Sequence, residues 1–199
     1  MTDDGQDDVR AAEMRHRAAN TFQLISALAR MRGQRTAEPE ARRQLVWMAD
    51  AIGALGALER HRRGGGVDFQ AYLLEMAPVW RRRHTAAPIE VAVAMEPVIV
   101  PDQAASTLAL IVHELVSNAL AHAYPEGEPG QVEVSLSRAE DGERYQLVVR
   151  DHGRGFDPSS PSGRERFGLW FVRSLAAQVR GELKLDTRDG VCAQLLFSL

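Results

Sequence analysis

Residues 108 to 124 read LALIVHELVSNALAHAY, and this segment carries two regular patterns. Its apolar residues recur at every third or fourth position, which predicts a helix with one buried side. Glu114, Asn118 and His122 recur at every fourth position, so they lie about 6 Å apart along a second side of that helix. A carboxylate can orient or deprotonate a water, and an amide oxygen can bind a hard cation such as Mg²⁺. The segment therefore predicts a helix with a polar stripe that faces a ligand.

A second segment, LVVRDHGRGF at residues 147–156, makes this interpretation more specific. An apolar run that is typical of a strand ends at Asp151, and Gly153 and Gly155 follow it. Glycine lets the backbone approach a ligand closely and adopt positive φ. A glutamate and an asparagine one helical turn apart are usually only a solvated face. The two segments together, about thirty residues apart, are far more specific than either alone.

HELVSNALAHA and RDHGRGF resemble the N box and the G1 box of one ATP-binding domain. Histidine kinases, type II topoisomerases, a family of heat-shock chaperones and the MutL mismatch-repair proteins share this GHKL or Bergerat domain, which is an α/β sandwich. The resemblance implies that Glu114 positions the attacking group or its water and that Asn118 is the Mg²⁺ ligand. It also implies that Asp151 accepts a hydrogen bond from the adenine amino group of ATP. The cofactor-binding residues expected on this basis are Asn118, His122, Asp151, Gly153, Gly155, Arg166 and Gly168.

A third glycine-containing segment departs from the family pattern. The family usually closes the site with a Gly-x-Gly-Leu G2 box, whose backbone N–H groups bind the triphosphate at a helix N-terminus. Here the segment reads GRERFGLWFV, so Gly168 and Leu169 match while Arg166 stands where the first glycine is expected. Val191 likewise stands where family members commonly carry threonine. Arg166 either binds phosphate directly or obstructs the lid over the site, and the sequence leaves both possibilities open.

The N-terminal part of the chain has the pattern of a helical hairpin. Residues 1–8, MTDDGQDD, are expected to be an acidic flexible N-terminus, and residues 9–63 predict two helices with a polar break at 33–39. Apolar positions three and four apart form a narrow seam at Met14, Ala18, Thr21, Ile25 and Leu28, and at Leu45, Met48, Ile52 and Leu55. Because two such helices bury little alone, the antiparallel hairpin is expected to form a four-helix bundle with a second copy. Docking on the chain's own second domain is the alternative.

The first of these helices also carries a histidine on a polar stripe. The string EMRHRAANTFQLISAL, residues 13–28, resembles the phosphoacceptor helix of the HisKA_2 and HWE histidine kinases, whose pattern is His-Arg-x-x-Asn. A histidine on a polar helix face is ordinarily only a solvated residue, but the resemblance implies that His16 is phosphorylated. Asn20, one turn on, is then placed to contact the phosphoryl group or to orient a water or a receiver's aspartyl phosphate. The catalytic residues expected are His16, Glu114 and Asn20.

The two units meet at HRRGGG, residues 61–66. Residues 64–66 are three glycines and predict a flexible hinge. Residues 67–199 then form the GHKL-type catalytic domain, and the whole chain is of the α+β class. Strands are expected at residues 89–95, 131–137, 145–151, 182–186 and 192–197, and helices at 69–82, from about 101 and at 167–180.

Composition narrows the functional classes. The net charge of −3 argues against nucleic acid as the main partner. No apolar run approaches the ~20 residues of a membrane span, and the acidic start is unlike a signal peptide. Direct membrane insertion is therefore not expected, and a cytoplasmic location is expected. Cys192 is the only cysteine, which excludes an intramolecular disulfide.

The combined resemblance implies a histidine kinase of a two-component system. Such a protein autophosphorylates His16 from Mg-ATP, acts as a homodimer and passes the phosphoryl group to an aspartate of a response-regulator receiver domain. No sensory domain is expected in the short segment before His16, so the stimulus is expected from a separate sensor protein unless the sequence is an excised core. The altered G2 box leaves a histidine phosphotransferase, relaying phosphate between receivers, as the alternative. A kinase that acts on an anti-sigma-factor antagonist is a third possibility, but it leaves the His16 helix unexplained.

Overall fold

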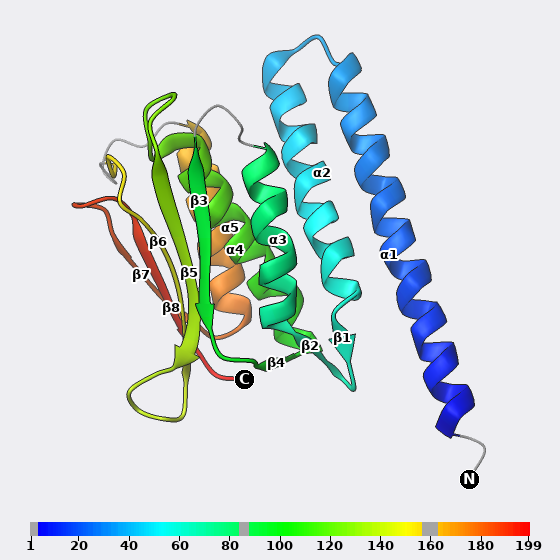
Figure 1. Ribbon diagram of the computed structural model, residues 1–199. Helices are drawn as coiled ribbons and strands as arrows, with labels where there is room; N and C mark the ends of the chain where they lie inside the picture. The colour runs from blue at the N-terminus through cyan, green and yellow to red at the C-terminus, as the bar shows by residue number, and fades with distance from the viewer. Residues whose placement is uncertain (1–3, 84–87, 157–162) are drawn as a thin grey trace.

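The computed structural model describes residues 4–83, 88–156 and 163–199, with residues 4–9, 83 and 163–166 described by their backbone alone. In this part of the chain, a five-stranded sheet carries a layer of helices on one face, and a helical hairpin packs on that layer (Figure 1). The expected α+β class is therefore confirmed.

The sheet is mixed. Across it the strands are β3 (Ile89–Met95), β5 (Gly130–Arg138), β6 (Tyr145–Asp151), β8 (Cys192–Phe197) and β7 (Glu182–Asp186). Strand β3 runs parallel to β5, and the other neighbours are antiparallel. Val132, Val134 and Leu136 of β5 are buried and alternate with more exposed residues, as a sheet with one covered face requires. The strands expected at 89–95, 145–151, 182–186 and 192–197 are confirmed.

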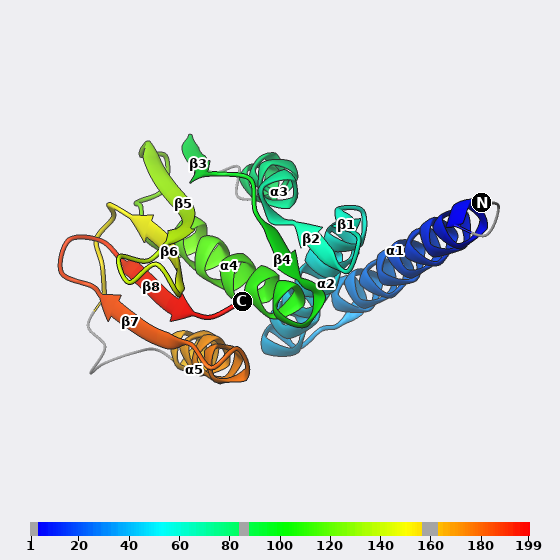
Figure 2. The same cartoon turned by 90° about the horizontal axis from the view of Figure 1, so that it is seen from below.

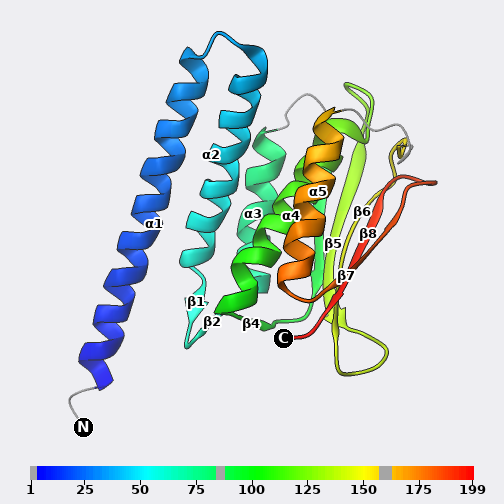
Figure 3. The same ribbon diagram turned by 180° about the vertical axis from the view of Figure 1, so that it is seen from behind.

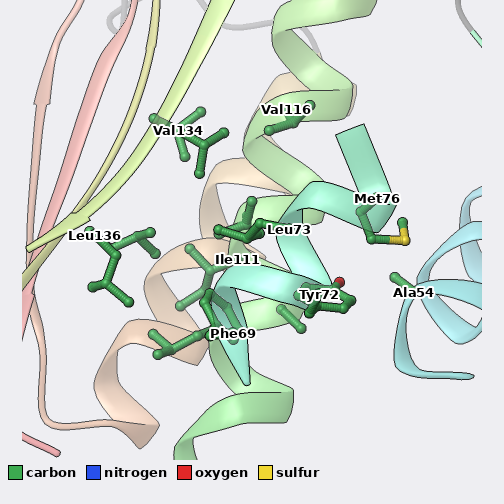
Figure 4. Packing of buried hydrophobic residues seen from close by; sticks show 14 of the residues in the cluster. Ala54, Phe69, Tyr72, Leu73, Met76, Ile111, Val116, Val134 and Leu136 are labelled. Atoms are coloured by element: carbon green, nitrogen blue, oxygen red, sulfur yellow. The ribbon is translucent and has the colours of Figure 1, made fainter. Parts of the chain in front are cut away.

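Helices α3 (Phe69–Arg83), α4 (Asp102–His122) and α5 (Gly163–Gln178) cover that face (Figure 2). Phe69 of α3, Ile111 of α4 and Val134 of β5 meet in a continuous core (Figure 4). By length and hydropathy α4 could cross a membrane. Here it is the central helix of the domain, since Leu108, Ile111 and most of its other apolar side chains are buried between the sheet and its neighbours.

The hairpin consists of α1 (Asp4–Arg35) and α2 (Pro39–Glu59). Helix α1 begins at Asp4, so most of the acidic segment expected to be flexible is helical. The two helices approach closely because the contact uses small residues. A Cβ on Gly56 would lie 3.0 Å from the Cβ of Phe22, and Ser26 Oγ donates to the carbonyl of Ala49 at 2.7 Å.

On α1, the expected apolar seam is not the surface that contacts α2. Ile25 and Leu28 of that seam are 45% and 52% exposed, and Met14 is 64% exposed. The two helices pack instead through Ala19, Ser26 and Gly56. The periodicity identified the helices correctly, but a sequence pattern cannot show which neighbour an apolar stripe meets.

The hairpin docks on the second unit of the same chain. Ala54, Ala57 and Leu58 of α2 are buried in the core that contains α3 and α4, and Figure 4 shows Ala54 facing Tyr72 and Met76. Helix α1 lies on the far side of α2 from the sheet (Figure 3). Docking in cis, one of the two arrangements expected for the hairpin, is therefore present, and pairing with a second copy stays a prediction.

The glycine triplet joins the units as part of a small sheet. Gly64 and Gly65, with φ of 53° and 88°, form a tight turn between β1 (Arg62–Arg63) and β2 (Gly66–Asp68), as two-residue hairpin turns require. Strand β2 also pairs with β4 (Ile99–Pro101). The joint expected at residues 64–66 is thus held by strand pairing rather than being an open linker.

Glu75 of α3 adds a second tie at this joint. It pairs with Arg60, and its Oε2 lies 2.7 Å from Nε2 of His61. Burial raises the pKa of Glu75, but the hydrogen bonds from Arg60 and His61 outweigh burial and hold that pKa below its usual range. The end of α2 is therefore fastened to α3 by charge as well as by the turn.

Candidate functional site

A cavity of about 100 Å³ lies between α4, α5 and the ends of β6 and β7. Its wall brings together most of the residues expected to bind a cofactor, namely Asn118, His122, Asp151, Gly155 and Gly168. Leu115, Leu169, Val172 and Leu185 supply apolar surface around them. This combination of apolar walls and a few convergent polar groups is typical of a small-molecule or cofactor site.

Asp151 is the buried polar group of this cavity. It ends β6 and is only 3% exposed. Its Oδ1 accepts hydrogen bonds from the backbone N–H of Gly153 at 2.9 Å and of Val191 at 3.2 Å. Both described bonds use one oxygen, so Oδ2 is the acceptor available to an N–H donor of a ligand.

Two of the expected glycines allow the chain after Asp151 to pass against neighbouring backbone. A Cβ on Gly153 would lie 2.2 Å from the carbonyl oxygen of Ala123, at the end of α4. Gly155 has φ of 62°, and its Cβ would lie 2.2 Å from the carbonyl oxygen of Thr187. Arg154, between them, donates to the carbonyls of Ala123 and His122 at 2.9 and 2.8 Å. Gly153 does not line the cavity but fixes the backbone that holds Asp151.

Replacing Gly153 with alanine is expected to lower the free energy of unfolding by about 3 kcal/mol, because the new methyl group overlaps backbone that cannot turn away. Denaturant unfolding measures this change. Gly33→Ala in α1 is the matched control, since its Cβ would meet neighbours only at 3.4 Å and beyond, and a helical alanine is favoured over glycine. Equal effects of the two substitutions would contradict the assigned packing.

Glu114 is 5% exposed and has a described partner for each oxygen. Its Oε1 accepts from the side-chain nitrogen of Asn118 at 2.9 Å, an orientation that turns the Asn118 amide oxygen away from Glu114. Its Oε2 accepts from the indole N–H of Trp47 at 2.5 Å. Trp47 belongs to α2, so a residue of the hairpin completes the surroundings of Glu114.

Helix α5 also packs closely against Glu114. A Cβ on Gly168 would lie 2.3 Å from Oε1 of Glu114, so only glycine allows this approach. The adjacent Phe167 and Phe171 meet the ring of Trp47 edge-on, with centroids 5.5 and 5.2 Å apart. Glu114 therefore lies at a junction of α2, α4 and α5. Arg166 lies in the first turn of α5, but its side chain is outside the described residues.

A second cavity, of about 970 Å³, opens between α2 and the α4–α5 layer. It shares Asn118 and Gly168 with the smaller cavity, and Arg42, Arg43 and Trp47 line its α2 side. The smaller cavity falls below the roughly 300–1,000 Å³ typical of ligand sites. A ligand of nucleotide size therefore needs both spaces, with its polar end passing Asn118 and Gly168.

The residues around Asn118 suit Mg²⁺ only with help from a ligand. In the described part of the chain, no group of three or more His, Cys, Asp or Glu side chains could hold a metal ion. Mg²⁺ commonly keeps several waters and binds through one or two protein oxygens plus substrate phosphates. The amide oxygen of Asn118, beside Glu114, fits that mode.

His16 and Asn20 lie together but away from these cavities. Both are exposed on α1, with the Asn20 side-chain nitrogen 3.3 Å from Nδ1 of His16. Glu13 pairs with Arg17 instead of His16. Gly56 lies opposite Ala19, so His16 is roughly 18 Å along the hairpin from the level of Trp47 at 1.5 Å per residue. The structure thus brings together the expected cofactor site but does not bring His16 to Glu114.

Trp47 and the backbone of Val191 are the contributors that sequence patterns did not identify. Trp47 lies beside the expected seam of α2 and resembles an ordinary apolar helix residue in the sequence. In the sequence, Val191 stood out only because it lacks the hydroxyl of the threonine that is common at this position. In the structure, its backbone N–H donates a hydrogen bond to Asp151. Both act across long sequence separations, where local patterns carry no signal.

Comparisons with known proteins agree with this arrangement. Residues 81–196 match the family described as histidine kinase-like ATPase domain. The chain is 29% identical over 192 residues to the sensor histidine kinase PdtaS of Mycobacterium tuberculosis, a match that covers 92% of this chain and 38% of PdtaS. It is 28% identical over 195 residues to blue-light-activated histidine kinase 2 of Erythrobacter litoralis, covering 92% of this chain and 54% of that protein.

Solved structures show the same fold. The Erythrobacter litoralis EL346 blue-light activated histidine kinase matches with a TM-score of 0.72 at 26% identity, over 96% of this chain and 59% of that one. The histidine kinase domain of EL346 matches with a TM-score of 0.70 at 23% identity, over 96% and 94% of the two chains, which is a likeness of fold. The present chain spans only 38% to 54% of the length of the PdtaS and Erythrobacter relatives.

Proposed function

The chain belongs to the histidine kinase-like ATPase domain family, and we propose that it is the core of a two-component histidine kinase. In this proposal it binds Mg-ATP, phosphorylates His16, and passes the phosphoryl group to an aspartate of a response-regulator receiver domain. The observation that carries the proposal is the fixed carboxylate of Asp151 in a pocket that shares Asn118 with the larger cavity, which Glu114 lines. A cytoplasmic location, where ATP is supplied, belongs to the same proposal.

Each pocket residue has a role that its chemistry supports. Oδ2 of Asp151 accepts a hydrogen bond from the adenine amino group, while Gly155 lets the backbone pass close to the base and Gly153 fixes the backbone that holds Asp151. Asn118 gives its amide oxygen to Mg²⁺, which neutralises phosphate charge when bound. Glu114 positions the attacking imidazole. His122 lines the base pocket and Gly168 the passage to the phosphates.

Asn20 can set the tautomer of His16. Rotating its amide by a half-turn places the oxygen, rather than the nitrogen, next to Nδ1 of the imidazole. The oxygen then accepts a hydrogen bond from Nδ1–H until the carboxylate of Glu114 takes over as acceptor, which leaves the lone pair on Nε2 free to attack. Nε2 forms a bond to the γ-phosphorus as the bond to the β–γ bridging oxygen breaks, and ADP leaves. The phosphorylated ring keeps its proton on Nδ1.

We also propose a homodimer formed through α1. Leu24, Ile25 and Leu28 are 62%, 45% and 52% exposed on a helix that the chain's second unit does not cover. These side chains form one stripe, and a second copy of the hairpin would bury it in a four-helix bundle. His16 is far from Glu114 in cis, so a partner chain or a large movement of the hairpin must bring them together.

Replacing both Leu24 and Leu28 with glutamate is expected to convert a dimer to monomers, because two charges would be buried at each copy of the contact. Sedimentation velocity measures the change. Gln23→Glu, an exposed neighbour of the stripe, is the control that adds charge without altering the stripe. A dimer that survives the double substitution would place the interface elsewhere.

The proposed function is tested with purified chain, γ-labelled ATP and Mg²⁺, with and without a chelator, beside calorimetry of nucleotide binding. Acid-labile, alkali-stable label that maps to the peptide containing His16 supports an active kinase. Binding without label indicates that a missing partner or sensor protein controls the hairpin. Neither binding nor label would favour the phosphotransferase, which needs His16 but not ATP.

A further inference from the structure

Trp47 connects the hairpin to the carboxylate that the proposed reaction uses. Its indole N–H is 2.5 Å from Oε2 of Glu114, and Asn118 binds the other oxygen. The ring is held on two further sides by Phe167 and Phe171 of α5. A residue of α2 thus makes a directional contact with Glu114 and packs on α5.

The contact between Trp47 and Glu114 keeps the proposed nucleophile, the imidazole of His16, away from Glu114. A carboxylate that positions an imidazole must lie within about 3 Å of one of its nitrogens. Oε2 of Glu114 already has the indole at that distance, and Glu114 is only 5% exposed. With a described donor already on each oxygen and so little of Glu114 exposed, we expect an imidazole to reach this carboxylate only after Trp47 moves.

We infer that Trp47 is a positioning residue that holds Glu114 in an unreactive state and must leave it before His16 is phosphorylated. The inference rests on the proposed function, because it assigns Glu114 to phosphoryl transfer. It gives the docked hairpin a role beyond packing, since the same helix that carries Trp47 is joined through a short turn to α1 and His16.

The nucleotide itself can release Trp47. Trp47, Asn118, Phe167 and Gly168 all line the larger cavity, which is where the phosphate end of a nucleotide in the Asp151 pocket would extend. A ligand shifts a conformational equilibrium only through its different affinity for the two states. Phosphates and their Mg²⁺ at Asn118 compete directly with the indole for this junction, so filling the cavity favours the undocked hairpin.

Trp47→Phe tests the inference because it keeps an aromatic ring against Phe167 and Phe171 but removes the N–H. The initial rate of His16 phosphorylation is expected to rise about tenfold, the factor that corresponds to loss of one hydrogen bond to a charged group. A residue needed only for packing would lower the rate or leave it unchanged. Trp170→Phe is the matched control, since Trp170 is 61% exposed on α5 and stacks near Phe167 without a described contact to Glu114.

Tryptophan fluorescence provides a readout that is independent of catalysis. In the Trp80→Phe/Trp170→Phe variant, Trp47 is the only tryptophan. Adding a non-hydrolysable ATP analogue with Mg²⁺ is expected to increase quenching of this residue by acrylamide at least twofold as it moves into solvent. In the variant that keeps only Trp80, whose indole donates to His113 inside the core at 2.9 Å, quenching is expected to stay constant.

The outcomes separate the inference from the proposed function. A phosphorylation rate that falls or stays constant in Trp47→Phe, while the unmodified chain is labelled at His16, overturns the inference alone. Unchanged Trp47 quenching at saturating nucleotide also overturns it. Increased quenching with no label in any variant would count against the kinase function while supporting the movement of Trp47.

Discussion

Replacing His16 with alanine is expected to abolish acid-labile, alkali-stable phosphate on the chain, the largest effect foreseen for any single substitution. The P–N bond needs an accessible imidazole nitrogen, and His16 is exposed beside Asn20 on a helix that a second copy can approach. Phosphate release under acid and retention under alkali, followed on the purified protein after incubation with labelled Mg-ATP, measures the change.

Other histidines serve as the comparison. His61 is bound to Glu75, and His113 is buried against Trp80. His152 is exposed at the end of β6, so His152→Ala is the matched control and should retain the label. Nucleotide affinity is expected to be equal in both variants, because neither histidine lines the base pocket. Label that persists in His16→Ala would move the phosphorylation site to another residue.

Asp151→Asn is expected to weaken nucleotide binding at least 100-fold with little change in fold. The amide has the shape of the carboxylate, so its oxygen can still accept from the N–H groups of Gly153 and Val191. Its NH₂ group then faces the adenine amino group, which places two donors against each other in a buried pocket. Loss of such a partner costs about 1–3 kcal/mol, and the opposed donors add to that loss.

Calorimetric titration with an ATP analogue measures this effect. Asp141→Asn is the control, because Asp141 accepts from two backbone N–H groups in an exposed turn and belongs to neither cavity. The backbone N–H of Arg144, helped by its guanidinium, holds the pKa of Asp141 at about 2, so the same chemical change removes a comparable charge. Equal nucleotide affinity in the two variants would show that the base binds elsewhere.

Much of the second unit could be read from the sequence. A period of two residues predicted strand β6. A period of nearly four residues predicted the helical stripe of Glu114, Asn118 and His122. Both periods are local properties of the chain. The glycines after Asp151 were also informative, because close backbone approach excludes every side chain larger than hydrogen. The roles assigned to these residues stay predictions.

The arrangement of the hairpin could not be read in this way. The seam through Ile25 and Leu28 predicted the helices, but the contact between them uses Ala19 and Gly56. Likewise, Gly64 to Gly66 suggested a free joint, whereas strand pairing with Ile99–Pro101 orders the segment. In both cases the partner is distant in sequence, and a local pattern specifies a face without specifying what covers it.

By itself the sequence determined the order of the long helices and of the strands of the five-stranded sheet, and it predicted the chemistry at Asp151 and Asn118 and the phosphorylation of His16, since all of these depend on short spacings. Only the tertiary structure decided that the hairpin lies on its own catalytic domain and that Trp47 reaches Glu114 across 67 positions of the chain. That contact depends on how α2 packs against α4 and α5, and packing is set by the shapes of surfaces that form only after the chain has folded.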